Sequence, residues 1–316
     1  MKVLQLVDSV EYVRTNSFQK QLLASLENSW DIAEHVLVPI SSMQGEVPDG
    51  YKILSTIKLR SLIKHQEVIK KYLNGAPVMV YEQDPWESFC DGATYPGAYE
   101  TIFNVLNIKT FLNNSKFWSD VVNSRGMKST FVHAGIDPNI CSVGESWELR
   151  DKTPIFVGSV HDWRRTSYDY LKEKTGVSVK FVPFMSSYDE YIRYTRTLGC
   201  FIAFVVPAVP AGTSWEKLFV MNGEKMTDSM VPPLKALENA AQGCFTIISN
   251  SQEFSSYHCE NVPCILTYDN VAEIPSMIDF VSSLGVDEAN SMIKQSVEHI
   301  KSKMGWQDFV EILRAE

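Results

Sequence analysis

Residues 231–250, VPPLKALENAAQGCFTIISN, join a helix to a buried strand and decide the fold. Two prolines open the segment where a first helical turn tolerates a missing N–H, and apolar residues then recur at helical spacing. The helix is expected to stop at Gly243, and the apolar run 244–249 follows at once as a strand. A helix that leads directly into a buried strand is typical of α/β proteins with parallel sheets.

Apolar runs and helical segments alternate along the rest of the chain in two series. The first series has expected strands at 2–7, 35–40, 77–82, 110–115 and 129–135, and expected helices at 17–28, 61–74 and 116–123. The second series has expected strands at 154–159, 177–183, 200–206, 244–249 and 263–268. Its further helices are expected near 165–174, 187–197, 287–303 and 306–315. This alternation predicts parallel sheets with helices on both faces.

A polar stretch at 143–153 separates the two series and is typical of a linker. We therefore expect an α/β protein with Rossmann-like domains at 1–150 and 151–290, and with helices at 291–316 that pack back towards the N-terminal domain. Open parallel sheets bind ligands outside the carboxyl ends of their strands. Two such sheets that face each other across a cleft hold two ligands, which suits the transfer of a group from a donor to an acceptor.

The composition disfavours several classes of protein. The chain has 316 residues, of which 45% are hydrophobic and 21% charged, as in ordinary globular proteins of one large or two medium domains. A net charge of −9 disfavours a protein coated in nucleic acid. No apolar run approaches the roughly 20 residues of a membrane span. The apolar N-terminal run is too short for a signal peptide, so a cytoplasmic protein is expected.

Sequence motifs of other chemistries are also missing. The chain has no G-x-G-x-x-G, which disfavours an NAD(P) oxidoreductase, and no G-x-x-x-x-G-K-[ST], which disfavours a P-loop kinase. The six cysteines form no C-x-x-C pair, and Cys200 and Cys244 lie in apolar strand-like runs, so buried free thiols are expected there. His133 and His161 have no second ligand at metal spacing, and we expect no metal site.

Three stretches resemble the GT-B glycosyltransferases, in particular the large retaining family that includes glycogen synthase-like and sucrose synthase-like enzymes. These stretches are STFVHAGIDPNI (129–140), PIFVGSVHDWRR (154–165) and PPLKALENAAQGCFTII (232–248). The resemblance implies transfer of a sugar, with retention, from a UDP- or GDP-sugar to a hydroxyl acceptor. It also implies that the donor binds the C-terminal domain and the acceptor the N-terminal domain. No metal and no cofactor beyond the donor is implied.

One departure from this family concerns its E-x7-E helix. Glu238 matches the second glutamate, which in the family usually contacts the ribose of the donor. The first glutamate, usually near the donor sugar, would fall at Met230, and Asp228 is the nearest acid. The loss indicates a divergent branch, for instance one that resembles the phage enzymes that glycosylate modified DNA bases.

The helix that carries Glu238 has the groups that a nucleotide diphosphate needs. A helix N-terminus offers free N–H groups and a partial positive charge, so Leu234 and Lys235 can present amides to the phosphates. Lys235 adds a positive charge, and Glu238 accepts from the ribose hydroxyls. The alternative is that Glu238 is a solvated helix residue and Lys235 its i−3 partner.

A second donor element is expected in the loop after 154–159. Arg164 and Arg165 follow Gly158 and Ser159, and a guanidinium group neutralises the charge that accumulates on a leaving diphosphate. The sequence does not distinguish which of the two arginines acts. The alternative is a basic surface turn.

The catalytic and acceptor-side candidates come from the N-terminal domain. Glu82 and Asp84 follow a strand, where they can bind an acceptor hydroxyl or stabilise positive charge on the sugar. The alternative is that Asp84 caps a helix that begins at Pro85. Near the N-terminus, the acceptor-side candidates are Asp8, Glu11, Tyr12 and Arg14.

The segment 51–75 is the one strong charge anomaly. It carries Lys52, Lys58, Arg60, Lys64, Lys70 and Lys71 against a single acid, Glu67. Such a run is commonly a solvated helix surface. Otherwise it binds a polyanionic acceptor, either DNA or anionic lipid headgroups, through residues such as Lys64 and Lys71. A glycan or small-molecule acceptor remains open beside these.

Two rival functions share the same architecture. One is a sugar-nucleotide epimerase, which would convert a nucleotide sugar without any acceptor. The other is a non-catalytic protein that binds nucleotide sugar and transfers nothing, which the missing first glutamate favours. Hydrolysis of the donor in the absence of acceptor separates an enzyme from a binding protein.

Overall fold

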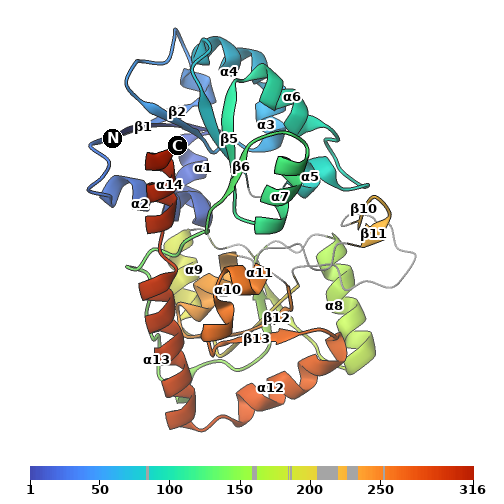
Figure 1. Ribbon diagram of the computed structural model, residues 1–316. Coiled ribbons are helices and arrows are strands. Elements are labelled where there is room, and N and C mark those ends of the chain that lie inside the picture. The colour runs from blue at the N-terminus through green and yellow to red at the C-terminus, as the bar shows by residue number, and fades with distance from the viewer. Residues whose placement is uncertain are drawn as a thin grey trace. The chain divides into compact units, whose positions relative to one another are not determined.

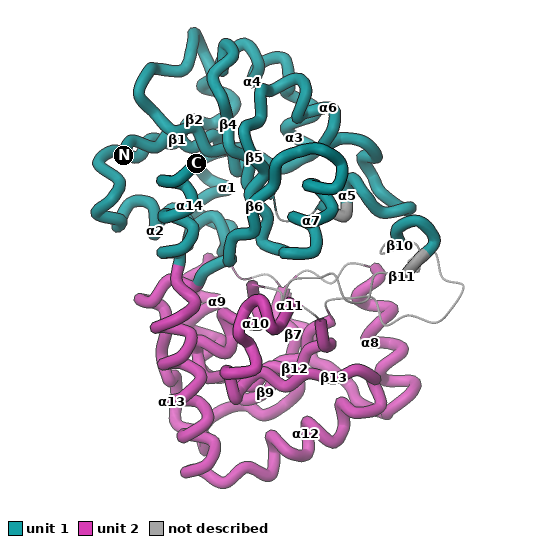
Figure 2. The backbone as a smooth tube through the Cα atoms, in the orientation of Figure 1, with its two compact units in different colours: residues 1–135, 220–224, 306–316 teal, residues 136–219, 225–305 magenta. Residues whose placement is uncertain are grey.

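The computed structural model describes residues 1–82, 85–158, 162–183, 185, 187–204, 220–225, 234–251 and 253–316. The chain forms two compact units (Figure 2). Unit 1 comprises Met1–Gly135, Val220–Glu224 and Trp306–Glu316, and unit 2 comprises Ile136–Phe219 and Lys225–Gly305. The chain therefore first passes between units at Gly135, whereas the sequence pattern places the boundary near residue 150.

Unit 1 is built on a parallel sheet (Figure 1). Its strands, in order across the sheet, are β2 (Glu34–Pro39), β1 (Lys2–Val7), β3 (Lys52–Ser55), β4 (Val78–Glu82), β5 (Ile108–Asn113) and β6 (Ser129–Phe131). Its helices are α1 (Val10–Thr15), α2 (Ser17–Asn28), α3 (Leu59–Lys64), α4 (Gln66–Leu73), α5 (Trp86–Phe89), α6 (Ala98–Val105), α7 (Lys116–Ser124) and α14 (Gln307–Ala315). The short strands β10 (Val220–Met221) and β11 (Glu224–Lys225) pair with each other.

The strand β3 is absent from the sequence prediction, although it lies inside the sheet. It pairs with β1 on one side and β4 on the other, and three of its four residues are buried. The run KILS is short and sits at the head of the basic segment 51–75, so neither length nor alternation marks it as a strand. The sheet therefore contains a central strand where the pattern indicates only a basic stretch.

Unit 2 is built on a second parallel sheet. Its strands, in order, are β13 (Ile265–Tyr268), β12 (Phe245–Ser249), β9 (Cys200–Ala203), β7 (Ile155–Val157) and β8 (Lys180–Val182). Its helices are α8 (Asp162–Thr175), α9 (Tyr188–Thr195), α10 (Leu234–Ala240), α11 (Glu253–Ser256), α12 (Ile274–Ser283) and α13 (Val286–Lys303). The five strands expected from the sequence are all present here, in shorter form.

Each sheet has one place where the strand order reverses. In unit 1 the chain runs from β1 outward to β2 and then crosses to β3 on the other side of β1. In unit 2 it runs from β7 to β8 and then crosses to β9. Adjacent loops at the carboxyl ends diverge at such a switch point and leave a crevice for a ligand. The loops after β1 and β3, and those after β7 and β9, are thus the favoured binding positions.

The turn from α10 into β12 depends on Gly243. Its φ is +74°, and a Cβ atom there would lie 2.6 Å from Ile293 Cγ2 and 3.0 Å from the carbonyl oxygen of Val143. The buried guanidinium of Arg150 fills the same corner and donates to the carbonyl oxygen of Gln242 at 3.2 Å. The glycine that ends the helix in the sequence pattern is therefore required by both conformation and space.

The final helix, α14, belongs to unit 1 through an aromatic cluster, whereas α13 stays in unit 2. The ring centroids of Trp306 and Phe18 lie 5.2 Å apart, and those of Phe309 and Tyr81 lie 5.5 Å apart. Phe18 in turn stacks on Tyr81 at 4.8 Å. These rings bury α14 and α2 together on one face of the sheet, beside β4.

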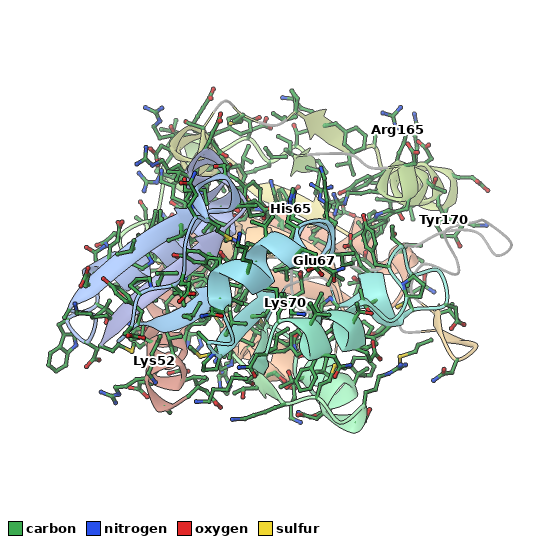
Figure 3. The ribbon with its side chains drawn as sticks, turned by 90° about the horizontal axis from the view of Figure 1, so that it is seen from above. Lys52, His65, Glu67, Lys70, Arg165 and Tyr170 are labelled. Atoms are coloured by element: carbon green, nitrogen blue, oxygen red, sulfur yellow. The ribbon has the colours of Figure 1, made fainter. Side chains whose placement is uncertain are left out.

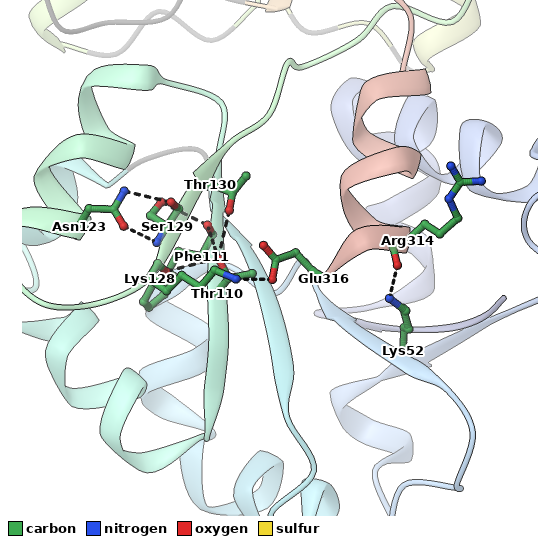
Figure 4. Close-up of polar contacts among 9 residues, drawn as sticks. All are labelled: Lys52, Thr110, Phe111, Asn123, Lys128, Ser129, Thr130, Arg314 and Glu316. Carbon is green, nitrogen blue, oxygen red and sulfur yellow. Dashed lines mark hydrogen bonds and ion pairs between the residues drawn. The ribbon is translucent and has the colours of Figure 1, made fainter.

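Polar contacts fix the end of α14 at the sheet (Figure 4). Lys52 Nζ donates to the carbonyl oxygen of Arg314 at 2.6 Å, where a lysine complements the negative end of the helix dipole. Lys128 Nζ lies 2.5 Å from a carboxylate oxygen of Glu316. Lys52, one of the six cations of the basic segment, therefore has a structural partner.

The outer strand β6 is covered by a side chain rather than by another strand. The amide of Asn123 accepts from the backbone N–H of Ser129 at 2.8 Å and donates to its carbonyl oxygen at 3.0 Å (Figure 4). Ser129 is thereby satisfied on the side that faces away from β5.

We expect Gly243→Ala to destabilise unit 2 more than Gly176→Ala. Both glycines have positive φ, +74° and +76°, but a Cβ atom at Gly176 meets nothing within 4 Å. Gly176→Ala should therefore cost roughly 1–2 kcal/mol of unfolding free energy from the left-handed backbone alone. Gly243→Ala should cost roughly 1–3 kcal/mol more, because the added methyl overpacks the corner. Urea denaturation measures both; equal losses would show that the close contacts at Gly243 relax freely.

Candidate functional site

The carboxyl end of β7 holds the side chain of Lys235. Its Nζ donates to the carbonyl oxygen of Val157, the last residue of β7, at 3.1 Å. The next residue, Gly158, has φ +132°, and a Cβ atom there would lie 2.9 Å from the same Nζ. A glycine is therefore needed for the ammonium group to approach the strand end at the switch point of unit 2.

Lys235 lies in a mixed electrostatic environment. Its Nζ stands 4.6 Å from the centre of the Tyr191 ring, which attracts a cation. Burial lowers the pKa of Lys235, the Glu238 carboxylate raises it, and the Arg164 guanidinium lowers it. The ammonium group is thus held beside a second cation in a partly desolvated place, which favours an anionic ligand.

Glu238 lies one turn after Lys235 on α10 and is fully buried. The hydroxyl of Tyr188 donates to its Oε1 at 2.7 Å. The alternative that Glu238 is a solvated helix residue is therefore wrong. Its carboxylate instead belongs to the buried side of α10, together with Asn239.

The structure distinguishes the two arginines of α8. The guanidinium carbon of Arg164 lies 5.0 Å from the centre of the Phe156 ring and 4.7 Å from that of Trp163, and burial lowers the pKa of Arg164. Arg165 is exposed on the same helix (Figure 3). Since Phe156 lies in β7, Arg164 packs against the strand whose carboxyl end holds Lys235.

The remaining donor-side candidates are only partly described. Leu234 is the first residue of α10 and is half-buried. Ser159 and Asp228 lie outside the described residues, as does the catalytic candidate Asp84. The structure therefore brings together three of the described candidates, Lys235, Arg164 and Glu238.

In unit 1, two carboxylates hold the loop after β3. The backbone N–H of Lys58 donates to Asp8 Oδ2 at 3.0 Å, and that of Leu59 donates to Glu82 Oε2 at 3.0 Å. Asp8 follows β1 and Glu82 ends β4, so the two acids reach the loop from either side of β3. Glu82, a catalytic candidate, is buried and serves at least to satisfy the N-terminus of α3.

The acceptor-side candidates of α1 lie close to this loop. Lys58 Nζ stands 4.3 Å from the centre of the Tyr12 ring, and the Tyr12 hydroxyl accepts from Asn16 Nδ2 at 3.1 Å. Glu11 and Arg14 are exposed on the same helix. The switch point of unit 1 therefore combines a half-buried aromatic ring with charges of both signs.

The basic segment 51–75 does not form a single face. Lys52 begins β3 at the amino edge of the sheet and binds α14, whereas Lys58 lies at the carboxyl edge. Figure 3 shows Lys52 apart from Lys70 and Glu67 of α4. Lys64 of α3 and Lys71 of α4 are exposed. The cations available to a polyanion are therefore those of the two helices.

Several side chains of these sites carry no sequence motif. Tyr188 and Tyr191 contact Glu238 and Lys235, yet neither is predicted as a site residue, and Lys58, predicted only as one cation of the basic segment, contacts Tyr12. The one available signal is the spacing of the two tyrosines, which places them on one face of α9 after a serine N-cap.

Other site types find no support in the described residues. Within them, no group of three or more His, Cys, Asp and Glu side chains is arranged to hold a metal ion. No helix there is both long and apolar enough to cross a membrane. All six cysteines are free thiols, and Cys200 and Cys244 are buried as predicted. Burial raises the pKa of Cys90 to about 12.

Solved structures resemble the chain over its whole length. An alpha-glucosyltransferase in complex with UDP and a 13-mer DNA containing an HMU base has a TM-score of 0.63 at 9% identity and covers 99% of both chains. The DNA modifying enzyme beta-glucosyltransferase has a TM-score of 0.57 at 9% identity and covers 100% of both. Anabaena Alr3699/HepE in complex with UDP has a TM-score of 0.58 at 11% identity and also covers 100% of both.

These likenesses establish the fold. No protein-family model matches the sequence, and comparison with curated proteins gives no match. The predicted resemblance to GT-B glycosyltransferases is nevertheless confirmed at the level of structure, because the two parallel α/β units have that architecture.

We expect the pKa of Lys235 to lie below its ordinary value of 10.5 and to fall further in Glu238→Gln. Burial lowers the pKa, and the substitution removes a negative charge that raises it. NMR of the protein with 13C-methylated lysines measures the titration, and Lys235→Arg identifies the signal by its loss. A Lys235 pKa at or above 10.5, or one that rises in Glu238→Gln, would contradict this account of the site.

Proposed function

We propose that the protein is a glycosyltransferase that moves a sugar from a UDP-sugar to a hydroxyl acceptor. The observation that carries the proposal is the convergence of Lys235 and Arg164 at the carboxyl end of β7, the switch point of unit 2. Two desolvated cations at this position suit a diphosphate. Solved proteins of the same fold include glucosyltransferases in complex with UDP, which supports UDP as the nucleotide.

In this proposal each group of the donor has its own contacts. The diphosphate binds the ammonium of Lys235, the guanidinium of Arg164 and the amide of Leu234. The ribose hydroxyls donate to the carboxylate of Glu238. Because Glu238 is fully buried, the donor reaches it by displacing the atoms that cover the carboxylate.

The reaction then needs little acid–base chemistry from the protein. The acceptor oxygen forms a bond to the anomeric carbon, and the bond from that carbon to the phosphate oxygen breaks. The acceptor proton passes to the leaving phosphate, whose negative charge Lys235 and Arg164 neutralise. We propose that this transfer proceeds with retention. NMR of the product reports the anomeric configuration.

For the acceptor we propose DNA that carries a hydroxylated base, bound by unit 1. Two observations support this choice. Solved proteins of this fold include an alpha-glucosyltransferase in complex with DNA and a DNA modifying beta-glucosyltransferase. Exposed cations on α3 and α4, among them Lys64 and Lys71, supply phosphate contacts in a chain whose net charge is −9.

We expect Arg164→Ala to weaken UDP binding by roughly ten- to hundredfold, which corresponds to the loss of a charged hydrogen bond. Its affinity for uridine, which lacks the diphosphate, should stay unchanged. Arg165→Ala is the matched control, because Arg165 is exposed on the same helix. Isothermal titration calorimetry measures all four affinities. Equal UDP affinity in the two variants would remove Arg164 from the diphosphate site.

We expect binding to duplex DNA to weaken steeply with salt, with a log–log slope of several units, because each phosphate contact releases counterions. Lys64→Glu combined with Lys71→Glu should lower the affinity and reduce the slope by about two, while UDP binding stays intact. The control is Lys172→Glu with Lys174→Glu on α8, which changes the net charge equally. If the wild type does not bind duplex DNA in a salt-dependent way, and the double variant has the same DNA affinity, the acceptor is small or neutral. Recruitment to anionic vesicles in place of DNA would indicate a lipid-linked acceptor.

Donor turnover separates the proposed activity from its rivals. Slow hydrolysis of UDP-glucose in the absence of acceptor supports a transferase, because water then replaces the acceptor. Conversion of UDP-glucose into another UDP-sugar would indicate an epimerase. Tight binding of UDP-glucose with no turnover on any acceptor would indicate a non-catalytic protein.

A further inference from the structure

Two buried tyrosines of α9 hydrogen-bond to neighbouring side chains of α10. The hydroxyl of Tyr188 donates to Glu238 Oε1 at 2.7 Å, and that of Tyr191 donates to Asn239 Oδ1 at 2.8 Å. Glu238 and Asn239 are neighbours on α10 and point in different directions, so a single hydroxyl on α9 could not donate to both side chains. Two donors one turn apart on α9 match two acceptors in sequence on α10.

The local sequence fixes the position of these tyrosines. Ser187 caps α9, and its Oγ accepts from the backbone N–H of Glu190 at 3.1 Å. Tyr188 is therefore the first helical residue, and Tyr191 lies three residues later on the same face. Both rings are buried, each with 6% of its surface exposed.

Tyr191 also bears on the donor-site lysine. Its ring lies under Lys235 Nζ at 4.6 Å, while the carbonyl oxygen of Val157 holds the same Nζ at 3.1 Å. The ring is kept in place by its bond to Asn239, whose Nδ2 has no hydrogen-bond partner among the described residues. The hydrogen bond between Tyr191 and Asn239 therefore fixes the orientation of both side chains.

We propose that Tyr188 and Tyr191 are positioning residues of the donor site. Tyr188 orients the Glu238 carboxylate towards the ribose, and Tyr191 holds the Lys235 ammonium at the diphosphate. The inference rests on the proposed function, since it concerns the side chains proposed there to bind the UDP-sugar. Neither tyrosine touches the reacting atoms.

The protonation state of the tyrosines suits this role. Burial is the largest cause that raises the pKa of Tyr188 and of Tyr191 above the ordinary value, and the Glu238 carboxylate adds to it. Both hydroxyls therefore keep their protons at neutral and mildly alkaline pH and remain donors. A tyrosinate would instead repel Glu238.

The experiment uses Tyr188→Phe and Tyr191→Phe, which remove the hydroxyls and keep the rings. Tyr168→Phe is the matched control, because Tyr168 is buried in the same unit and donates at 2.8 Å to a backbone carbonyl, that of Ile202. Calorimetry with UDP, 2′-deoxy-UDP and uridine separates the contributions of ribose and diphosphate. Thermal unfolding of all three variants reports the cost to stability.

We expect the wild type to bind UDP more tightly than 2′-deoxy-UDP. Tyr188→Phe should reduce this ratio by roughly three- to tenfold, the loss of about one oriented hydrogen bond. Tyr191→Phe should weaken UDP binding by a similar factor and leave uridine binding unchanged. Tyr168→Phe should lower the unfolding temperature and leave every affinity ratio as in the wild type.

The outcomes separate the two proposals. If the wild type selects UDP over 2′-deoxy-UDP and both Phe variants behave like Tyr168→Phe, the tyrosines are packing residues and the proposed function stands. If the wild type binds UDP without regard to the 2′-hydroxyl, Glu238 does not contact the ribose there and the role of Tyr188 is overturned. A wild type that binds no UDP overturns the proposed function and, with it, this inference.

Discussion

A buried guanidinium, that of Arg150, connects several backbone segments of unit 2. It donates to the carbonyl oxygens of Val143, Glu145, Leu198 and Gln242. Taking an arginine out of water is costly, and here its N–H groups find backbone oxygens in place of water. These oxygens belong to the linker, to the segment after α9 and to the corner between α10 and β12. Together with the hydrogen bond from Arg196 Nε to Gln242 Oε1 at 2.9 Å, these contacts join the end of α9 to the end of α10, the two helices on which Tyr188 meets Glu238.

The two cations at the carboxyl end of β7 are costly to bury. Lys235 and Arg164 are both partly desolvated, and burial lowers the pKa of each. The fold nevertheless holds both side chains in place. Arg164 packs against Phe156 of β7, and Lys235 packs against the ring of Tyr191. An anion between them restores the interactions that water no longer provides. A site of this kind needs little rearrangement of its charges when a phosphate binds.

The order of strands and helices was largely predictable, because buried parallel strands are marked by short apolar runs with helices between them. Strand β3 was not predicted, because a strand of four residues that begins with a lysine shows neither a long apolar run nor a clear alternation of apolar and polar residues. Arg164 and Arg165 could not be told apart, since neighbours on a helix differ by about 100° in direction and only packing fixes which of them faces the sheet. The tyrosines of α9 could not be assigned either, because their partners lie 50 and 48 residues further along the chain.

The amide of Asn123 shapes the outer boundary of the sheet in unit 1. A carboxamide has the same donor and acceptor as a peptide group, so at Ser129 it imitates the strand that a larger sheet would have next. A second molecule that approaches this edge finds both groups of Ser129 already occupied. Polymerisation by strand addition has to begin with the loss of two existing hydrogen bonds, which raises the barrier to forming its first nucleus. One short side chain thus makes strand addition at Ser129 less favourable.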